Sequence, residues 1–167
     1  MVTQAFKDCL AGIYRGEQVG EAIFETKLPK AADADQRYIL GSLLQFETEG
    51  KAKIRPLLMK YDMSIAEDGG ARPEGTAAAN AIGQMPWRER FDTMAKSINA
   101  IYLPKYQELE KLVTENEDAE AYRLARFMGE HELAIMRACE NIAAAKSDPI
   151  EPIRRLLQFP LTDVETN

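Results

Sequence analysis

The 167-residue chain has few cysteines and no excess of basic residues, and both shortages narrow its function. Cys9 and Cys139 stand alone, so the sequence lacks the CxxC pairs of a zinc ribbon or a rubredoxin-type iron site. The formal net charge is −6, whereas nucleic acids and anionic membranes bind basic surfaces. We therefore expect neither nucleic acid nor a membrane as a partner.

Long apolar runs are missing as well. No segment approaches the roughly 20 apolar residues of a helix that spans a bilayer. The first residues, MVTQAFKDCLAG, lack the charged and then apolar order of a signal peptide. Together with the two isolated cysteines, this predicts a reduced, cytoplasmic setting. Hydrophobic residues make up 46% of the chain and charged residues 29%, which is typical of one folded domain over residues 1–167.

Four segments carry apolar side chains at alternating steps of three and four, the period of an α-helix. They cover residues 3–27, 34–61, 87 to about 112 and 119 to about 145. Pro56 and Pro104 lie inside the second and third segments, where each removes a backbone donor and predicts a kink. Residues 62–85 break the pattern with glycines and a proline, which predicts a long connection with a short helical turn at about 76–82. A short helix is expected within 148–160.

This order of segments predicts an all-α fold, because no strand-like alternation competes with the helices. Two helix pairs with short turns, joined by one long crossover between helices two and three, describe a ferritin-like four-helix bundle. The bundle should cover about residues 3–145, followed by a C-terminal extension at 146–167 that carries the short helix. An up-down-up-down bundle is disfavoured because its loops are all short. The crossover requires helices two and three to run parallel.

Three of these helices each place one polar residue where the apolar stripe should continue. They are Glu17 in the first helix, Glu47 in the second and His131, the only histidine, in the fourth. Burying a carboxylate without compensation is costly, so an inward glutamate needs a metal ion, a cation or a shared proton. Glu17, Glu47 and His131 are therefore the candidate metal ligands, and we expect them to meet in one small cavity.

Three stretches resemble helices of the rubrerythrin-like branch of the ferritin-like di-iron carboxylate proteins. YRGEQVGEAIF is similar to the first helix of that family, LLQFETEGKAKIRPLL to the second and RLARFMGEHELAIMRA to the fourth. The resemblance covers most of residues 5–145. It implies a four-helix bundle in which helices one and three each give a glutamate, while helices two and four each give a Glu-x-x-His pair. It also implies a homodimer.

Carried over by position, this resemblance implies an incomplete ligand set. Glu17, Glu47 and His131 match three of the six ligand positions, but Gly50 and Met128 stand where a histidine and a glutamate are expected. The window of the third helix, residues 97–103, contains no carboxylate, and Asn99 is the nearest substitute. The cysteine iron site of full rubrerythrins is missing.

Several interpretations stay open at this point. His131 could be a core histidine hydrogen-bonded to Glu17 or Glu47, a metal ligand, or an exposed residue on a mis-phased helix. The two inward glutamates could instead pair with a basic residue. The candidate bases are Lys51, Lys53 and Arg15, and the glutamates expected on solvated faces are Glu49, Glu130 and Glu132.

Two functions from different classes follow. The first is a divergent ferritin-like metalloprotein that binds one or two ions of Fe, or Mn or Zn, for oxidase or peroxide chemistry. The alternative is a scaffold that has lost its di-iron centre, binds no metal, and holds a partner or a small ligand where Gly50 and Met128 open space. Iron storage is disfavoured because neither a complete ferroxidase site nor an assembly surface is recognisable. Ile153, Leu156 and Phe159 should pack on the bundle or on a second subunit.

Overall fold

The chain folds almost entirely into helices. The computed structural model describes residues 2–162 and contains no β-strand in that range, which confirms the all-α prediction. In chain order the α-helices are α1 (Gln4–Lys27), α2 (Ala34–Lys60), α3 (Ala71–Ala81), α4 (Trp87–Ser97), α5 (Leu103–Lys111), α6 (Ala119–Ala143) and α7 (Glu151–Arg154). A 3₁₀ turn, η1 (Leu28–Lys30), follows α1, and a π-helical segment, η2 (Ile98–Tyr102), joins α4 to α5.

The three longest helices begin at polar side chains that cap them. The first two caps are Thr3 for α1 and Asp33 for α2, and each accepts a hydrogen bond from the amide three residues ahead. Asp118 caps α6 in the same way and also accepts bonds from Lys60 and Tyr61 at the end of α2. Such caps satisfy helix N–H groups that have no partner within the helix. Local sequence thus determines where these helices start.

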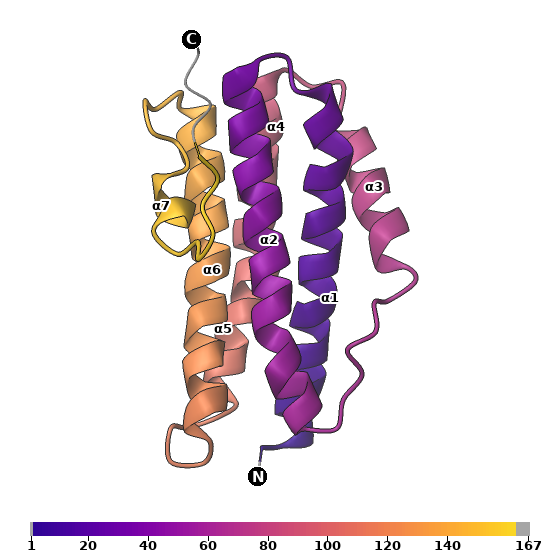
Figure 1. Ribbon diagram of the computed structural model, residues 1–167, viewed down its shortest axis with the longest axis vertical. Helices are drawn as coiled ribbons and strands as arrows, with labels where there is room; N and C mark the ends of the chain where they lie inside the picture. Colours follow the sequence, from indigo (N-terminus) through magenta and orange to yellow (C-terminus); the bar gives the residue numbers. More distant parts are fainter. Residues whose placement is uncertain (1, 163–167) are drawn as a thin grey trace.

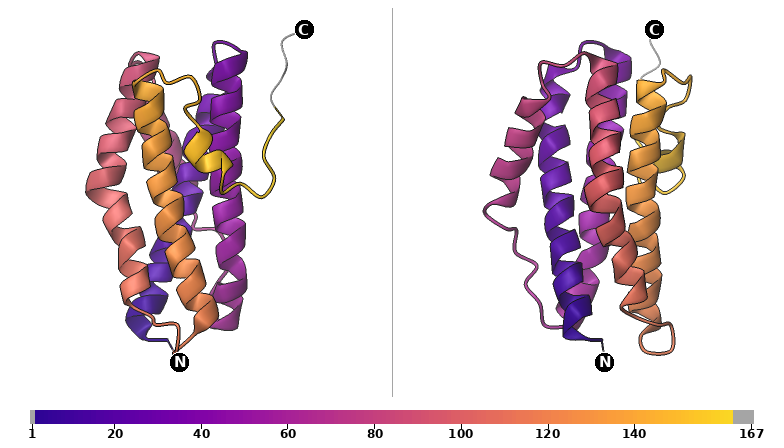
Figure 2. Two further views of the ribbon diagram at one scale, coloured as in Figure 1. Left: turned by 90° about the vertical axis from the view of Figure 1, so that its left-hand side faces the viewer. Right: turned by 180° about the vertical axis from the view of Figure 1, so that it is seen from behind.

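The long helices lie side by side along the longest axis of the molecule (Figures 1 and 2). The chain rises in α1, descends in α2, descends again through α4, η2 and α5, and rises in α6. The connection between α2 and α4 therefore carries the chain back along the whole length of the molecule. Helix α3 lies within this connection and packs along the outer side of α1.

Helix α3 is longer than the helical turn predicted at 76–82, because it begins at Ala71 and has 11 residues. Its inward face consists of Ala71, Gly75 and Ala79, spaced by four residues and buried. A Cβ atom at position 75 would lie 2.7 Å from the Cβ of Ala22 and would overlap the backbone carbonyl of Val19. Small residues at this spacing let two helix backbones approach closely, a signal that a search for large apolar residues misses.

The third predicted helix is divided by η2, immediately before Pro104. Proline has no N–H to donate and its ring crowds the preceding turn, so the hydrogen-bond ladder shifts here by one residue. The shift changes which side chains face inward beyond this point. Ile101 follows Ile98 by three residues and would continue the apolar stripe of an uninterrupted α-helix, but it is 52% exposed. Tyr106, one turn further on, is buried instead.

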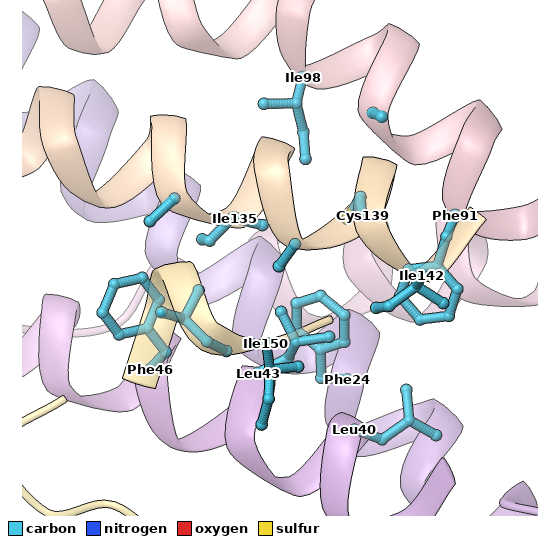
Figure 3. Packing of buried hydrophobic residues seen from close by; sticks show 14 of the residues in the cluster. Phe24, Leu40, Leu43, Phe46, Phe91, Ile98, Ile135, Cys139, Ile142 and Ile150 are labelled. Carbon is cyan, nitrogen blue, oxygen red and sulfur yellow. The ribbon is translucent and has the colours of Figure 1, made fainter. Parts of the chain in front are cut away.

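The interior contains two apolar clusters with a polar layer between them. The first cluster, shown in Figure 3, includes Phe24, Leu40, Leu43, Phe46, Phe91, Ile98, Ile135 and Ile142. The second includes Phe6, Leu10, Ile13, Ile54, Leu57, Leu109, Leu124 and Met128. Along α1, α2 and α6 the two clusters occupy opposite halves of each helix. The residues between the halves come to lie at one level, near the middle of the molecule.

The C-terminal segment packs partly on the helices. Ile153 is fully buried in the first apolar cluster and Leu156 packs against it, whereas Phe159 is 67% exposed. The amides of Gln158 and Phe159 donate to the carboxylate of Glu49, which was expected on a solvated face. Residues 163–167 of the predicted extension lie outside the described residues. Among residues 2–162, no helix has the length and apolar character that crossing a bilayer demands.

Candidate metal centre

The three predicted ligands in the polar layer between the two clusters come from three helices. Glu17 of α1 and His131 of α6 have no exposed surface, and Glu47 of α2 is 6% exposed. All three side chains therefore face inward, as their positions on the apolar stripes predict. The interpretation of His131 as an exposed residue is wrong.

Glu132 also belongs to this layer, although the sequence pattern placed it on a solvated face. It is 6% exposed, so that prediction is wrong. The reason is that α6 is covered from more than one side, since it contacts α2 as well as α4, η2 and α5. A helix packed against several neighbours buries a broad stripe, and two consecutive positions can then both face inward.

Glu17, His131 and Glu132 form the tightest group. One ligand atom from each lies within 4.8 Å of the other two, and Glu17 Oε2 is 3.6 Å from His131 Nε2. Ligand atoms around one transition-metal ion lie roughly 3–4 Å apart, because metal–ligand bonds to these atoms are about 2.1 Å long. The group therefore has about the size that a single ion requires. Glu47, the third predicted ligand, lies outside this group but is buried beside it.

Two atoms of this group are buried without a hydrogen-bond partner. Tyr106 donates to Glu17 Oε1 over 2.7 Å, which leaves Glu17 Oε2 free. His131 Nε2 lies 3.1 Å from the carbonyl oxygen of Phe46, which can only accept, so the neutral ring carries its proton on Nε2. His131 Nδ1 then has a lone pair with no partner. Buried polar atoms in proteins are nearly always paired, so this pair of exceptions needs an explanation.

The basic residues that could have neutralised the layer pair elsewhere. Lys51 binds Glu21 and Glu67. Lys53 lies 4.1 Å from the centre of the Phe127 ring, and Arg15 pairs with acidic residues of the connection between α2 and α4. A salt link from any of the three to Glu17 or Glu47 is thus excluded.

Burial and mutual repulsion set the protonation of the layer. Burial raises the pKa of Glu132 to about 8. It also raises the pKa values of Glu17 and Glu47 well above their ordinary range, with further increases from neighbouring carboxylates. Burial lowers the pKa of His131 to about 4, so the ring is neutral at pH 7. With no ion present, the layer holds bound protons at neutral pH.

Glycines leave the space that the polar groups occupy. A Cβ atom at position 50 would overlap the Glu17 carboxylate and lie 2.8 Å from His131 Nε2. A Cβ atom at position 20 would overlap the Glu47 carboxylate. The expected ligand at position 50 is therefore replaced by space that Glu17 and His131 fill, and Met128 is buried in apolar packing. The idea that Gly50 and Met128 open a pocket is wrong.

A cavity of about 180 Å³ borders the polar layer. Glu47, Tyr106 and Glu132 line one part of it. Most of its remaining wall is apolar or small and comes from α1, α3, α4, η2 and α6, including Val19, Ile23, Phe24, Met94, Ile98 and Ile135. The carboxyl groups thus border an apolar space large enough for a small molecule.

The helix predicted over residues 87 to about 112 contributes a different side chain to the layer than expected. Asn99, the predicted substitute ligand, is exposed, and Tyr106 reaches Glu17 instead. Sequence reasoning missed Tyr106 because the π-helical segment changes the phase of the helix, although Pro104 was a visible signal for such a change.

Comparison of the chain with protein-family models, curated proteins and solved structures gives no significant match.

Proposed function

We propose that this chain is a divergent metalloprotein whose polar layer holds a divalent transition-metal ion. The observation that carries the proposal is a cluster of three buried carboxyl groups and a neutral imidazole with unpartnered atoms at Glu17 Oε2 and His131 Nδ1. No basic side chain of the described residues forms a salt bridge with Glu17, Glu47 or Glu132 other than His131 itself. A mixed set of carboxylate oxygen and imidazole nitrogen suits Fe, Mn and Zn.

Within this proposal the residues have different roles. Glu17, His131 and Glu132 are the ligands, and Glu47 is a further carboxylate for a second ion or for a proton. His131 would bind either through Nδ1 after its ring turns, or through Nε2 after the ring proton moves from Nε2 to Nδ1. Tyr106 is a positioning residue, because its hydrogen bond to Oε1 keeps Oε2 of Glu17 turned toward His131. A redox-active ion such as Fe would supply electron transfer to a small oxidant, which is the basis for oxidase or peroxide chemistry.

We further propose that the fold is a ferritin-like four-helix bundle with a crossover, related to the rubrerythrin branch. Support comes from the direction of the chain, since α2 and the segment formed by α4, η2 and α5 run parallel (Figure 1). Further support comes from the polar layer near the middle of the molecule, which α1, α2, α5 and α6 build. The ligand set departs from that family at Gly50 and Met128. A homodimer is part of the same proposal and is tested by sedimentation.

The cavity of about 180 Å³ favours a second candidate function, the binding of a small apolar ligand by a scaffold without metal. In that case the carboxyl groups stay protonated and share hydrogen bonds with each other and with the ligand. Their raised pKa values are compatible with this state at pH 7.

The deciding experiment is a metal count on untagged protein, before and after anaerobic loading with Fe(II), Mn(II) or Zn(II). We expect about one or two tightly held ions per chain. Glu17→Gln and His131→Gln should lose them, while Glu130→Gln, an exposed carboxylate on the same helix, should keep them. Absence of metal from every sample would reject the metal proposal and direct attention to apolar ligands.

A further inference from the structure

A second, smaller cavity of about 90 Å³ lies beyond the apolar cluster, near the end of α1. It is bordered by residues of α1, η1, α2, α3 and α4, namely Thr26, Lys27, Lys30, Leu40, Ala79, Gly83, Trp87, Arg90 and Phe91. Three of these residues are basic and none is acidic. This is unusual for a chain with a net charge of −6.

Lys27 is the most unusual residue of this cavity. Its side chain is buried, with the residue 6% exposed, and its Nζ atom has no hydrogen-bond partner. A lone buried ammonium group is strongly disfavoured, because nothing replaces the water that it loses. Arg90 and Lys30 add to the cost, and together with burial they lower the pKa of Lys27 to about 8.

The neighbouring cations also keep donors free. The guanidinium group of Arg90 uses Nε to bind the carbonyl of Met85, and no bond involves its terminal nitrogens in the described residues. Lys30 reaches only the neutral amide oxygen of Asn80, over 3.3 Å. Trp87 and Arg90 belong to the first turn of α4, where the helix dipole adds positive potential and Glu89 of the same turn offsets part of it.

We propose that this cavity binds one small oxyanion, of the size of phosphate, between Lys27, Arg90 and Lys30. The anion would supply the partner that the Lys27 ammonium lacks, and the guanidinium group of Arg90 can bind two of its oxygens at once. A volume of about 90 Å³ admits such an anion, since one water needs roughly 10–15 Å³ by the same measure.

This site is separate from the proposed metal centre. Lys27 is ten residues beyond Glu17 on the same helix, which corresponds to about 15 Å along its axis. Phe24 of the first apolar cluster lies between these two residues along α1. The two proposals can therefore succeed or fail independently.

The test is a titration of untagged full-length protein with inorganic phosphate, methyl phosphate and acetate, at an ionic strength held constant with sodium chloride. Melting temperature is the readout for all three anions, and the ³¹P linewidth is a second readout for the phosphates. The three arms distinguish free phosphate, a phosphate ester and a carboxylate as the source of the oxyanion. Lys27→Met and Arg90→Gln are the test variants, and Lys96→Met, an exposed lysine of α4, is the control.

We expect a saturable rise in melting temperature with at least one anion in the wild type and in Lys96→Met. Lys27→Met should bind about tenfold more weakly or worse, yet melt no lower than wild type without anion, because it removes an unpaired buried charge. A purely structural lysine would instead make this variant less stable. No saturable response in the wild type, or an unchanged response in Lys27→Met, would overturn the proposal. If Lys27→Met does not fold, unchanged affinity in Arg90→Gln overturns it.

Discussion

At the scale of single residues, the polar layer depends on glycines as much as on ionisable side chains. The Glu17 carboxylate occupies the space beside Gly50, and the Glu47 carboxylate occupies the space beside Gly20. Glycine weakens a helix interior by up to about 1 kcal/mol relative to alanine. Its presence at these two positions is explained by the close approach of a carboxyl group. The two glycines therefore lower helix stability and leave space for the carboxyl groups.

Gly50→Ala tests this explanation. The new methyl group would displace the Glu17 carboxylate from its place beside His131, so we expect metal affinity to fall by about tenfold or more. The unfolding free energy of metal-free protein should change by no more than about 1 kcal/mol, because gained helix propensity offsets the displacement. Metal titration and urea unfolding measure the two effects.

Gly129→Ala is the matched control, because a Cβ atom there meets nothing within 4 Å. It should keep wild-type metal affinity and gain up to about 1 kcal/mol in unfolding free energy. Equal metal affinities for the two alanine variants would contradict the role assigned to Gly50.

The raised pKa values predict a pH dependence of metal-free protein. The native pKa of Glu132 is about 8 and its ordinary value is 4.5, so between these values the native state binds more protons than the unfolded state. The stability of metal-free protein should therefore fall as pH rises from 6.5 to 8, by at most about 1.4 kcal/mol per pH unit for each such group. His131 destabilises the protein only as pH falls from 6.5 toward 4. Burial lowers the pKa of Lys27 to about 8, so this lysine opposes the fall in stability as the pH approaches 8.

Urea unfolding of metal-free protein at pH 6.5, 7.2 and 8 measures this slope, which Glu17 and Glu47 should increase. Glu132→Gln should flatten it, whereas Glu130→Gln should leave it unchanged. A wild-type slope of zero or of the opposite sign between pH 6.5 and 7.2, where Lys27 stays protonated, would show that the layer is ionised without metal.

At the scale of elements, the position of α3 depends on close contact with α1. Gly75 faces the Val19 carbonyl, a backbone atom that cannot move aside as a flexible side chain can. Helix α3 also supplies Ala78 to the wall of the larger cavity, and Ala79 to the smaller one. One short helix therefore closes part of both proposed sites.

Gly75→Ala should therefore destabilise the protein by about 1–3 kcal/mol despite the gain in helix propensity, because it forces α3 away from α1. Urea unfolding measures the loss, and amide hydrogen exchange should show faster exchange confined to residues 71–81. Stabilisation similar to that expected for Gly129→Ala would mean that α3 is not tightly packed.

At the scale of the whole molecule, the polar layer joins α1, α2, α5 and α6, which the apolar clusters hold together from either side. An ion bound by α1 and α6 at this level would link the two clusters. It would also replace bound protons, so its affinity should increase with pH. Metal binding should therefore increase the stability of the entire chain.

Saturating metal should stabilise wild-type protein by about 2.7 kcal/mol at a free concentration one hundred times the Kd. The rise in melting temperature should be absent in Glu17→Gln and should be reversed by a chelator. Thermal unfolding with and without metal, at pH 6.5 and pH 8, provides the measurement. A rise of equal size in Glu17→Gln would place the metal outside the polar layer.

Much of the fold was predictable because helix formation is local. Apolar spacing predicted the four long segments within a few residues. The structure shows the caps Thr3, Asp33 and Asp118 at three of their starts, and each cap acts on its own helix locally. The inward positions of Glu17, Glu47 and His131 followed from the same spacing. Glu132 and Tyr106 did not follow, because their burial depends on which neighbours cover α6 and on the phase of a helix interrupted at η2.

The sequence by itself therefore determined the helical class, the main helix starts and the presence of polar groups in an apolar stripe. Only the tertiary structure decided which polar groups meet, what fills the space at Gly50, and that Lys27 is left without a partner. The physical reason is that periodicity reports the face of a helix on which a residue lies. Burial, hydrogen bonding and charge balance depend instead on segments that are distant in sequence and adjacent in space.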